Sequence, residues 1–590
     1  MSGSSAYRNI YGISAAPGVG IGRAFVYKKG APTITRRRIG ASQVEAEIER
    51  FLYTLHLAGD EIRRIRRMVA AEQGEELAQI FDAQLAMLED IHIKEQTQQW
   101  IREKNYSAEH AFSVTLQEMK KAFREIENEY LRARVSDVAD IENQVLMRLA
   151  GSEVQGLQAT RSNTIIFAYE LLPSEMVQLE RRQIKGVVLD VGGTTSHAAI
   201  IARSLRLPII VGTGNSSQRV KAGELAIVDG NEGVVHVQPS DAMERDYRAL
   251  LRRQLRRQRD LDSRSDLPAQ TRDGSDITLL ANIDIPTEIQ TALDHGARGV
   301  GMYRTEFLYL SYRLPSEEEQ YQAYVQIVRA ISPDPVTIRT IDLGGDKLSH
   351  VLDVQEESNP FLGWRGIRIC LDEPVLFKTQ LRALLRAGCE GKVQILLPMI
   401  SEIRELTQAC ALLEEAKEEL RASGQAFQED CKVGIMVEVP SVAIMIDQFA
   451  IQADFLSLGT NDLTQYVLAV DRGTSRVANL YDPFHPAVLR LIKMVADGGE
   501  RYGKPVSICG EMAGDPLATI LLIGLGLSSL SLSPGLIPEV KEIIRATTSE
   551  QARHVAEKCL GMATGDEVCR YLEEIMGEVL PFWRRTSRRE

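Results

Sequence analysis

The second half of the chain carries basic side chains that follow short apolar segments. They are Arg304, Arg339, Lys347, Arg365 and Arg472. Guanidinium groups bind phosphate and carboxylate oxygens through paired hydrogen bonds, so several of them at one place indicate an anionic substrate. Each residue by itself is equally well explained as a surface charge, and only their predicted convergence favours a binding site.

Acidic and amide side chains occupy similar positions. Glu438 lies at the end of the apolar segment VGIMVEV, and Asn461 and Asp462 follow FLSLG. Two carboxylates near a bound phosphate are oxygen ligands of the kind that Mg²⁺ prefers. A phosphorylated carboxylic acid would fit both the cations and a magnesium ion held by Glu438 and Asp462. The alternative, in which the two acids only pair with neighbouring arginines, stays open. Further polar residues that follow such segments are Glu306, Asp342, Cys509 and Glu511.

The hexapeptide GGTTSH at residues 192–197 is a separate candidate. It lies between the apolar segments GVVLDV and AAIIA, and its Thr and Ser residues can cap a helix that begins there. His197 would then lie in the first helical turn, where unpaired N–H groups attract anions and disfavour an imidazolium ion. This setting favours a neutral, nucleophilic histidine that can carry a phosphoryl group. A structural histidine behind a capped helix start is the alternative.

The elements that would position the first group of residues are eight apolar segments, each followed by a helix-prone stretch. They are ITLLANI (277–283), GVGMYRT (299–305), VTIRTID (336–342), VQILLPM (393–399), VGIMVEV (433–439), FLSLGTN (455–461), PVSICGE (505–511) and LSSLSLS (527–533). Eight such units in about 300 residues have the size and rhythm of a (β/α)8 barrel. Because these barrels gather their chemistry at the carboxyl ends of the strands, the polar residues are predicted to share one rim.

The first half of the chain predicts a different organisation. The opening NIYGISAAPGVGIGRAFVYK indicates two short strands separated by a Pro/Gly turn. Residues 43–149 then have the apolar spacing of a helical hairpin or bundle. Strand-like segments return at NTIIFAYE, GVVLDV, PIIVGT, LAIVDG and VVHVQ, so the first strands are predicted to pair with them across a helical insert.

The segment MERDYRALLRRQLRRQRDLDSR predicts a helix between the two halves. It has seven arginines between Arg245 and Arg259. A solvated linker helix is the simpler interpretation, and a binding patch for an acidic partner is the alternative.

Composition narrows the class of protein. The 590 residues are 44% hydrophobic and 25% charged, with a net charge of -12, which disfavours general binding to nucleic acid. No apolar stretch is long enough for a membrane span and the first residues do not resemble a signal peptide, so a cytoplasmic protein without membrane insertion is expected. The seven cysteines show no CxxC spacing, which disfavours a disulfide framework or a zinc site.

Several long motifs resemble one known family. GGTTSHAAIIARS resembles the phosphohistidine motif of the phosphoenolpyruvate-utilising enzymes, and DFLSLGTNDLTQYVLAVDR resembles their second motif. GVGMYRTEF, RTIDLGGDK, NPFLGWRGIRI, MVEVPS and ICGEMAGD, with ISAAPG and EYLRARVSDVADI nearer the start, are similar to enzyme I of the bacterial sugar phosphotransferase system. The resemblance covers nearly the whole chain in the same order.

The resemblance implies a reaction. His197 would accept a phosphoryl group from phosphoenolpyruvate and pass it to a histidine of the carrier protein HPr, with release of pyruvate. Glu438 and Asp462 would be the magnesium ligands. Cys509 would donate the proton that converts the enolate to pyruvate, because this carbon needs a proton once the phosphoryl group has left. A plain buried thiol is the alternative for Cys509.

The resemblance also implies which residues bind the substrate. They are Arg304, Arg339, Lys347, Arg365, Asn461, Asp462 and Arg472. The arginines at 304, 339 and 472 would bind the phosphate, Lys347 and Arg365 would complete the anionic pocket, and Asn461 would hold the carboxylate end.

Four parts follow for this α/β multidomain chain. They are an α/β phosphohistidine domain (1–40 and 150–239), an inserted helical domain that docks HPr (41–149), a linker helix (240–268), and a (β/α)8 barrel (269–590) that binds phosphoenolpyruvate and forms a homodimer. Because His197 and the pocket lie in different domains, they would meet by domain movement.

Two positions depart from the family pattern. Thr194 stands where the family commonly has arginine, and Leu172 stands where many members have threonine. The threonine at 172 would help to orient the histidine, so control of the tautomer is in question, and Thr194 or Thr195 would have to supply the hydrogen bond.

Three alternative functions are possible for a chain with these motifs. Phosphoenolpyruvate synthase and pyruvate phosphate dikinase share the histidine domain and barrel but need a nucleotide-binding domain, and the chain has no GxxxxGK[ST] loop. The nitrogen-regulatory relative of enzyme I uses a different carrier and usually has an N-terminal sensory domain, for which ISAAPG near residue 13 leaves no room. An inert scaffold that only binds phosphoenolpyruvate is the third, supported solely by the two departures.

Overall fold

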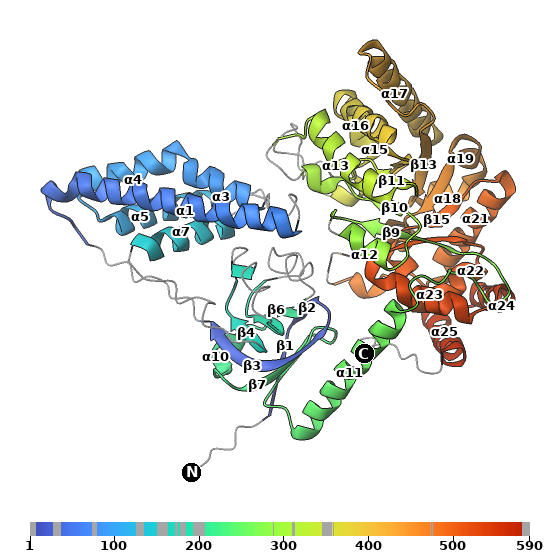
Figure 1. The fold of residues 1–590 in the computed structure, drawn as a ribbon, viewed down its shortest axis with the longest axis horizontal. Helices are drawn as coiled ribbons and strands as arrows, with labels where there is room; N and C mark the ends of the chain where they lie inside the picture. Colours follow the sequence, from blue (N-terminus) through green and yellow to red (C-terminus); the bar gives the residue numbers. More distant parts are fainter. Residues whose placement is uncertain are drawn as a thin grey trace. The chain divides into compact units, whose positions relative to one another are not determined.

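The computed structural model describes residues 7–27, 37–73, 80–125, 135–149, 163–171, 175–176, 184–192, 207–286, 288–309, 313–344, 357, 359–472, 474 and 476–580. The chain divides into two compact units, the first ending at Arg256 and the second beginning at Arg257. Figure 1 traces the helices and strands of both units. Two predicted site residues, His197 and Lys347, lie outside the described residues, as do Leu172, Thr194 and the helix expected after GGTTSH.

The first unit contains an eight-stranded mixed sheet. Its strands are β1 (Arg8–Tyr11), β2 (Ile13–Ala16), β3 (Val19–Tyr27), β4 (Thr164–Ala168), β5 (Gly186–Leu189), β6 (Ile209–Val211), β7 (Leu225–Asp229) and β8 (Val234–Val237). Their order across the sheet is β1-β8-β7-β3-β4-β5-β6-β2. The run β3-β4-β5-β6 is parallel, and the other pairs are antiparallel. The predicted pairing of the first strands with those beyond the helical insert is confirmed.

The opening segment forms three strands, so the prediction of two was wrong. β1 and β2 are separated only by Gly12, yet they pair at opposite ends of the strand order. The sheet therefore curls until its two edges approach each other at this residue. A Cβ atom on Gly12 would lie 2.6 Å from the carbonyl oxygen of Val211, so the close approach requires glycine. The sequence has a turn signal at Pro17–Gly18 but only a single glycine at Gly12, so it does not reveal the break between β1 and β2.

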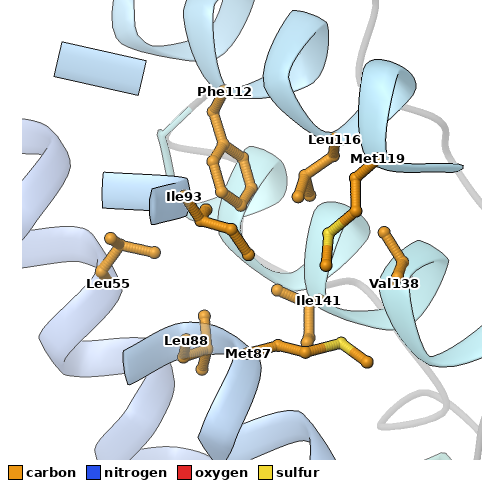
Figure 2. Close-up of a pocket in the computed structure, with 9 residues that line it drawn as sticks. All are labelled: Leu55, Met87, Leu88, Ile93, Phe112, Leu116, Met119, Val138 and Ile141. Atoms are coloured by element: carbon orange, nitrogen blue, oxygen red, sulfur yellow. The ribbon is translucent and has the colours of Figure 1, made fainter. Parts of the chain in front are cut away.

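The described part of residues 43–149 is helical, as predicted. Its helices are α1 (Val44–Gln73), α3 (Ile80–Glu89), α4 (Ile91–Lys104), α5 (Ala108–Glu125) and α7 (Val135–Leu149). Phe51 and Phe112 pack in its core with ring centroids 5.6 Å apart. A small cavity of about 10 Å³ lies among these helices. Figure 2 shows its lining, which consists of aliphatic, phenylalanine and methionine side chains. A cavity of this size and lining is ordinary core packing.

Helix α11 (Asp241–Asp262) contains the arginine-rich segment, and the boundary between the two units falls within it. Its first half is attached to the sheet of the first unit by Tyr247, whose hydroxyl donates a hydrogen bond to Oδ2 of Asp229 at 2.9 Å. Among the helices that the structure describes, none combines the length and the apolar character needed to cross a bilayer.

The second unit is built on a closed barrel of eight parallel strands, as predicted. In chain order these strands are β9 (Thr278–Ile283), β10 (Val300–Tyr303), β11 (Val336–Arg339), β12 (Val393–Leu397), β13 (Lys432–Val437), β14 (Phe455–Leu458), β15 (Val506–Ile508) and β16 (Ser529–Leu532). Each strand pairs with the next, and β16 pairs with β9 to close the barrel. Most strands end before the predicted positions, so the polar residues lie mainly on the loops that follow them.

The α-helices that follow α11 share one large apolar core with the barrel strands. They are α12 (Glu288–Asp294), α13 (Glu317–Ile331), α15 (Ile367–Asp372), α16 (Pro374–Ala387), α17 (Ile403–Ala422), α18 (Pro440–Ile444), α19 (Ile446–Gln452), α20 (Thr460–Leu468), α21 (Pro486–Tyr502), α22 (Pro516–Gly524), α23 (Ile537–Ala546), α24 (Ser549–Leu560) and α25 (Gly565–Val579).

Side chains along the barrel strands alternate between two cores. Leu456 and Leu458 of β14 belong to the large cluster that includes the surrounding helices. Phe455 belongs to a separate cluster with Met302, Leu396, Met436 and Cys509. Because successive side chains of a strand point to opposite faces, this smaller cluster lines the barrel interior. Cys509, the first residue after β15, therefore points inward at the carboxyl end of the barrel.

Candidate active site

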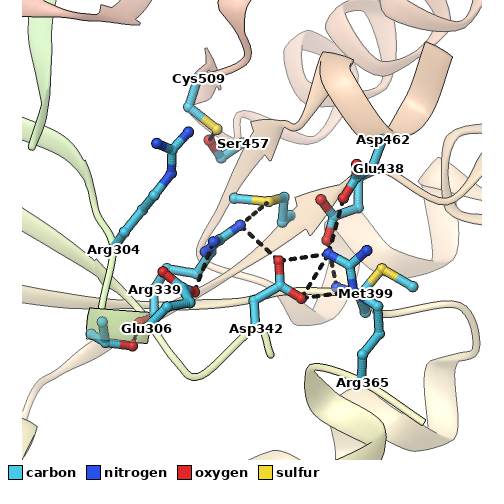
Figure 3. Close-up of polar contacts among 12 residues, drawn as sticks. Arg304, Glu306, Arg339, Asp342, Arg365, Met399, Glu438, Ser457, Asp462 and Cys509 are labelled. Atoms are coloured by element: carbon cyan, nitrogen blue, oxygen red, sulfur yellow. Dashed lines mark hydrogen bonds and ion pairs between the residues drawn. The ribbon is translucent and has the colours of Figure 1, made fainter. Parts of the chain in front are cut away.

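Asp342 is the centre of a charged cluster at the carboxyl ends of the barrel strands (Figure 3). Its Oδ2 lies 2.9 Å from Nη1 of Arg339. Arg365 donates from Nε to Oδ1 of Asp342 at 3.1 Å and from Nη2 to Oδ2 at 2.9 Å. Arg365 Nη2 also donates to Oδ2 of Asp462 at 3.1 Å, while Arg339 Nη2 donates to Oε1 of Glu306 at 2.8 Å. The loops after different strands thus meet in one network of ion pairs.

Both central arginines are held charged. Burial acts to lower the pKa of Arg339, but the carboxylates of Glu306 and Asp342 outweigh it and raise the pKa above its ordinary value. Burial likewise opposes the charge of Arg365, and Asp342 and Asp462 raise its pKa. Nε of Arg339 is buried and has no hydrogen-bond partner. The cluster therefore keeps a donor available for an anionic ligand.

Glu438 directly follows β13 and is only 2% exposed. Burial raises the pKa of this carboxyl well above its ordinary value, and the nearby carboxylates of Asp342 and Asp462 raise it further. Its Oε1 accepts a hydrogen bond from the backbone N–H of Met399 at 2.6 Å. Met399 has a φ of 57°, which is unfavourable for a residue other than glycine. The local backbone is thus held in a costly conformation next to an energetically strained acid.

Glu438 and Asp462 fit a divalent cation. Oδ1 of Asp462 is buried and makes no hydrogen bond, and its ion pair with Nη2 of Arg472 is long at 3.8 Å. An unsatisfied buried carboxylate oxygen is costly and is a suitable ligand for Mg²⁺. Within the described ranges no three His, Cys, Asp or Glu side chains are grouped to hold a metal. Two carboxylates agree with a Mg²⁺ site that a substrate phosphate completes.

Asn461 and Arg472 lie beside this pair and both contact Glu511. Oδ1 of Asn461 accepts a hydrogen bond from the backbone N–H of Glu511 at 2.9 Å, and its Nδ2 donates to Oε1 of Glu511 at 3.2 Å. Arg472 Nη1 lies 3.6 Å from the same carboxylate. The Glu511 side chain is 83% exposed, so a bound anion could replace it as the partner of both residues.

Arg304 reaches the same end of the barrel but does not join the central ion pairs. Its Nη1 donates to both carboxylate oxygens of Asp284, at 2.8 and 2.9 Å. In Figure 3 its guanidinium lies toward Cys509. Arg304 therefore lies at the same end of the barrel as the cluster, with the carboxylate of Asp284 as its partner.

Cys509 is 2% exposed. Burial raises the pKa of its thiol, while a hydrogen bond from Ser457 and the charge of Arg339 act in the opposite direction. The Oγ of Ser457 donates to Sγ at 3.3 Å, as the adjacent side chains in Figure 3 show. A thiol of raised pKa keeps its proton near neutral pH, which is the form that a proton donor needs.

Sequence reasoning missed the central role of Asp342 and gave no weight to Asp284. Both follow predicted strands, as the recognised residues do, so the signal was present. What the sequence does not specify is which carboxylate each arginine contacts, because the partners come from loops far apart in the chain.

In the first unit, Asp190 lies two residues before the GGTTSH segment. Its Oδ1 accepts hydrogen bonds from Oγ of Ser216 at 2.6 Å, from Oγ1 of Thr213 at 3.1 Å and from the backbone N–H of Ser217 at 3.1 Å. Burial favours the neutral acid, but the hydrogen bonds from Ser216 and Ser217 outweigh it and lower the pKa of Asp190. These hydrogen bonds connect the residue after β5 to the segment that follows β6.

Three family profiles match the chain. They are the PEP-utilising enzyme N-terminal region over residues 11–134, the PEP-utilising enzyme mobile domain over 160–233 and the PEP-utilising enzyme PEP-binding domain over 258–549. The barrel with its charged rim lies in the last of these. The fold and the matched profiles together define the class of phosphoenolpyruvate-utilising enzymes.

Full-length relatives indicate which family within this class the chain belongs to. Phosphoenolpyruvate-protein phosphotransferases of Haemophilus influenzae, Staphylococcus carnosus and Bacillus subtilis are 40%, 38% and 39% identical to this chain, each over 96% of the chain and 99% of the relative. The chain belongs to the phosphoenolpyruvate-protein phosphotransferase family, whose members carry out phosphoryl transfer from phosphoenolpyruvate. The resemblance inferred from the motifs is confirmed.

Proposed function

We propose that this chain transfers the phosphoryl group of phosphoenolpyruvate to His197 and then to a histidine of the carrier protein HPr, releasing pyruvate. This would be the first step of a sugar phosphotransferase system. The observation that carries the proposal is the buried cluster around Asp342, in which Arg339 and Arg365 stay charged beside Glu438 and Asp462. Such a cluster suits a small anion that carries both phosphate and carboxylate groups.

Substrate binding is assigned to the cations of this rim. Arg304, Arg339 and Arg472 would bind the phosphate, and Lys347 and Arg365 would complete the pocket. Asn461 would hold the carboxylate once the substrate replaces Glu511. The long ion pairs of Arg472, at 3.8 and 3.6 Å, support this role because they can be exchanged for shorter contacts to phosphate oxygens.

Glu438 and Asp462 would hold Mg²⁺ together with substrate oxygens. The arginines are already paired with carboxylates, so an added divalent cation would favour the binding of a multiply charged anion. When bound, the ion would stabilise the negative charge that develops on the enolate oxygen. It would also lower the cost of keeping Glu438 ionised in a buried site.

Cys509 would supply the proton at C3 of the enolate. The protonated thiol points into the barrel interior, and Arg304 and Arg339 lie close enough to affect its pKa. His197 would take up the phosphoryl group as a neutral nucleophile. Asp190 would act on it indirectly by holding the residues that precede GGTTSH.

The domain roles follow the predicted division of the chain. The helices of 41–149 would dock HPr, the sheet of 1–40 and 150–239 would carry His197, the helix of 240–268 would link the halves, and the barrel of 269–590 would bind phosphoenolpyruvate and form a homodimer. Exposed apolar residues support such an interface on the barrel: Ile444, Met445 and Ile451 are 61%, 50% and 63% exposed on or between the adjacent helices α18 and α19.

The experiment that tests this proposal follows label from phosphoenolpyruvate to a carrier. The protein is incubated with Mg²⁺ and phosphoenolpyruvate labelled in the phosphoryl group, and HPr or the nitrogen-branch carrier is then added separately. We expect transfer to HPr, and none to an HPr variant without its histidine. Transfer only to the nitrogen-branch carrier would contradict the sugar-branch assignment. A protein that binds phosphoenolpyruvate but is never labelled would be the inert scaffold.

A further inference from the structure

Several inward-facing side chains of the barrel are polar, and two of them are serines on adjacent strands. Ser457 lies between Leu456 and Leu458 of β14, and Ser507 lies between Val506 and Ile508 of β15. Since the flanking leucines and Ile508 belong to the outer core, the alternation of a strand turns both serines inward. Barrel interiors are usually filled by branched apolar residues, and a buried hydroxyl is costly unless it is hydrogen-bonded. Both residues therefore call for an explanation.

The two serines and Cys509 form a continuous chain of hydrogen bonds. Ser457 and Ser507 are direct partners in the pairing of β14 with β15, and Oγ of Ser507 donates to Oγ of Ser457 at 3.1 Å. Oγ of Ser457 in turn donates to Sγ of Cys509 at 3.3 Å. The thiol itself donates to the carbonyl oxygen of Leu458 at 3.5 Å. Oγ of Ser507 also lies 3.5 Å from the carbonyl oxygen of Leu456, but its shorter contact is the one to Ser457. The shorter hydroxyl contacts thus lead from Ser507 through Ser457 to the thiol sulfur.

Exposure changes along this chain in one direction. Cys509 is 2% exposed and Ser457 is fully buried, whereas Ser507 is only partly buried. A buried thiol that gives up its proton becomes a thiolate in an apolar surrounding, where it must be reprotonated before the next reaction. The hydroxyls provide a route from the accessible end to the sulfur without moving the strands.

We propose that Ser457 and Ser507 are positioning residues that relay a proton between solvent and the Cys509 thiol. This inference rests on the proposed function of Cys509 as the proton donor. The S–H bond breaks as the C–H bond at C3 of the enolate forms. The proton of the Ser457 hydroxyl then moves to the thiolate, that of Ser507 moves to Ser457, and water supplies a proton to Ser507. The net change is one proton from water to carbon.

The test measures two exchanges in one sample. The protein is incubated in D₂O with Mg²⁺, phosphoenolpyruvate and ¹³C-labelled pyruvate, without a carrier. Carbon exchange between pyruvate and phosphoenolpyruvate reports reversible chemistry, and deuterium in the methyl group of pyruvate reports exchange of the thiol proton with solvent. If the relay is cut, the thiol returns the same hydrogen to the next substrate. Deuterium entry per carbon exchange therefore falls.

We expect this ratio to fall at least about tenfold in Ser457→Ala and in Ser507→Ala, as for the loss of a proton-transfer group. Ser457→Thr keeps the hydroxyl and should retain the wild-type ratio, which guards against a failure to fold in Ser457→Ala. Thr337→Val is the matched control, because Thr337 is a buried hydroxyl of β11 that bonds to Gln394 and not to the relay. An unchanged ratio in both alanine variants would overturn the relay.

Cys509→Ala separates this inference from the proposed function. The acid role predicts that both exchanges fall together in that variant. If both persist, the assignment of Cys509 is wrong and the relay is overturned with it. If Cys509→Ala is inactive while the serine variants keep the wild-type ratio, the relay alone is overturned. A wild-type protein without carbon exchange contradicts the proposed reaction itself.

Discussion

Asp190 in the first unit and Glu438 in the second are both buried carboxyl groups that follow a strand, but they are stabilised in opposite ways. Asp190 is surrounded by hydroxyl and amide donors, which lower its pKa. Glu438 has one backbone donor, and its burial near two other carboxylates raises its pKa. The first is a satisfied group of structural type. The second is strained, as is typical of a site whose ligand supplies the missing charge.

The two sheets explain why the strain occurs in the barrel. Eight parallel strands direct all their carboxyl ends to one rim, so charged residues from many loops share a small volume. In the mixed sheet only the β3-β4-β5-β6 run is parallel, and neutral donors from one neighbouring segment suffice for Asp190. Charged residues therefore lie close together at one end of the closed barrel, whereas the strand ends of the mixed sheet do not all lie at one edge.

The largest effect is expected for Glu438→Gln, which removes the strained charge. The amide can still accept the hydrogen bond from Met399, so the folded barrel should become more stable and its melting temperature should rise. Labelling by phosphoenolpyruvate should fall by about three orders of magnitude, as for the loss of an electrostatic group in a catalytic site. Differential scanning calorimetry and the rate of labelling provide the two measurements. A lower melting temperature would show that Glu438 is not strained.

Cys509→Ala should have the next largest effect. Loss of a general acid slows its step by about 10²–10⁴-fold, and the alanine keeps the cations that bind the substrate. Pyruvate formation in a single turnover should therefore fall much more than the affinity for phosphoenolpyruvate measured by calorimetry. Equal losses in rate and affinity would argue for a structural thiol.

Asp190→Asn should destabilise the first unit by about 1–3 kcal/mol, because a charged acceptor of several buried hydrogen bonds is lost. Since the folded state lowers the pKa of Asp190, its stabilising effect is present above the ordinary pKa near 4 and disappears as the pH falls through the lower, folded value. Calorimetry from pH 7 to pH 3 should show the difference from wild type shrinking with acidity. Asp246→Asn, an exposed change on α11, is the control. A difference that grows with acidity would contradict this assignment.

The smallest effect is expected for Tyr247→Phe. It removes a hydroxyl that donates to Asp229 and is hydrogen-bonded to Nε2 of His236, and it should cost the first unit about 1 kcal/mol, without any change in the barrel. Denaturant unfolding of the intact protein, followed separately for the two units, measures it. A loss as large as that of Asp190→Asn would show that the linker helix contributes more to this unit than its hydrogen bond to the sheet.

The sequence predicted the barrel well because its eight apolar segments are strongly patterned, and residues such as Arg339 and Glu438 lie directly at their ends. It failed at Gly12, where two edge strands meet through one residue whose role depends on the curl of the whole sheet. The sequence also could not predict that Asp342 pairs with both Arg339 and Arg365. Asp342 and Arg365 lie 23 residues apart in the connection between β11 and β12, and Asp462, the other partner of Arg365, follows β14. The hydroxyls of Ser457 and Ser507 gain meaning only once the pairing of β14 with β15 is known.

One measurement directly tests whether phosphoenolpyruvate bound in the barrel phosphorylates His197 of the first unit. The protein is incubated with Mg²⁺ and labelled phosphoenolpyruvate, and the adduct is tested for stability in acid and base and located by mass spectrometry. We predict an acid-labile, base-stable phosphoryl group on His197. It should be absent from His197→Ala and greatly reduced in Arg339→Met. Label that survives in His197→Ala, or that forms at an undiminished rate in Arg339→Met, would contradict this prediction.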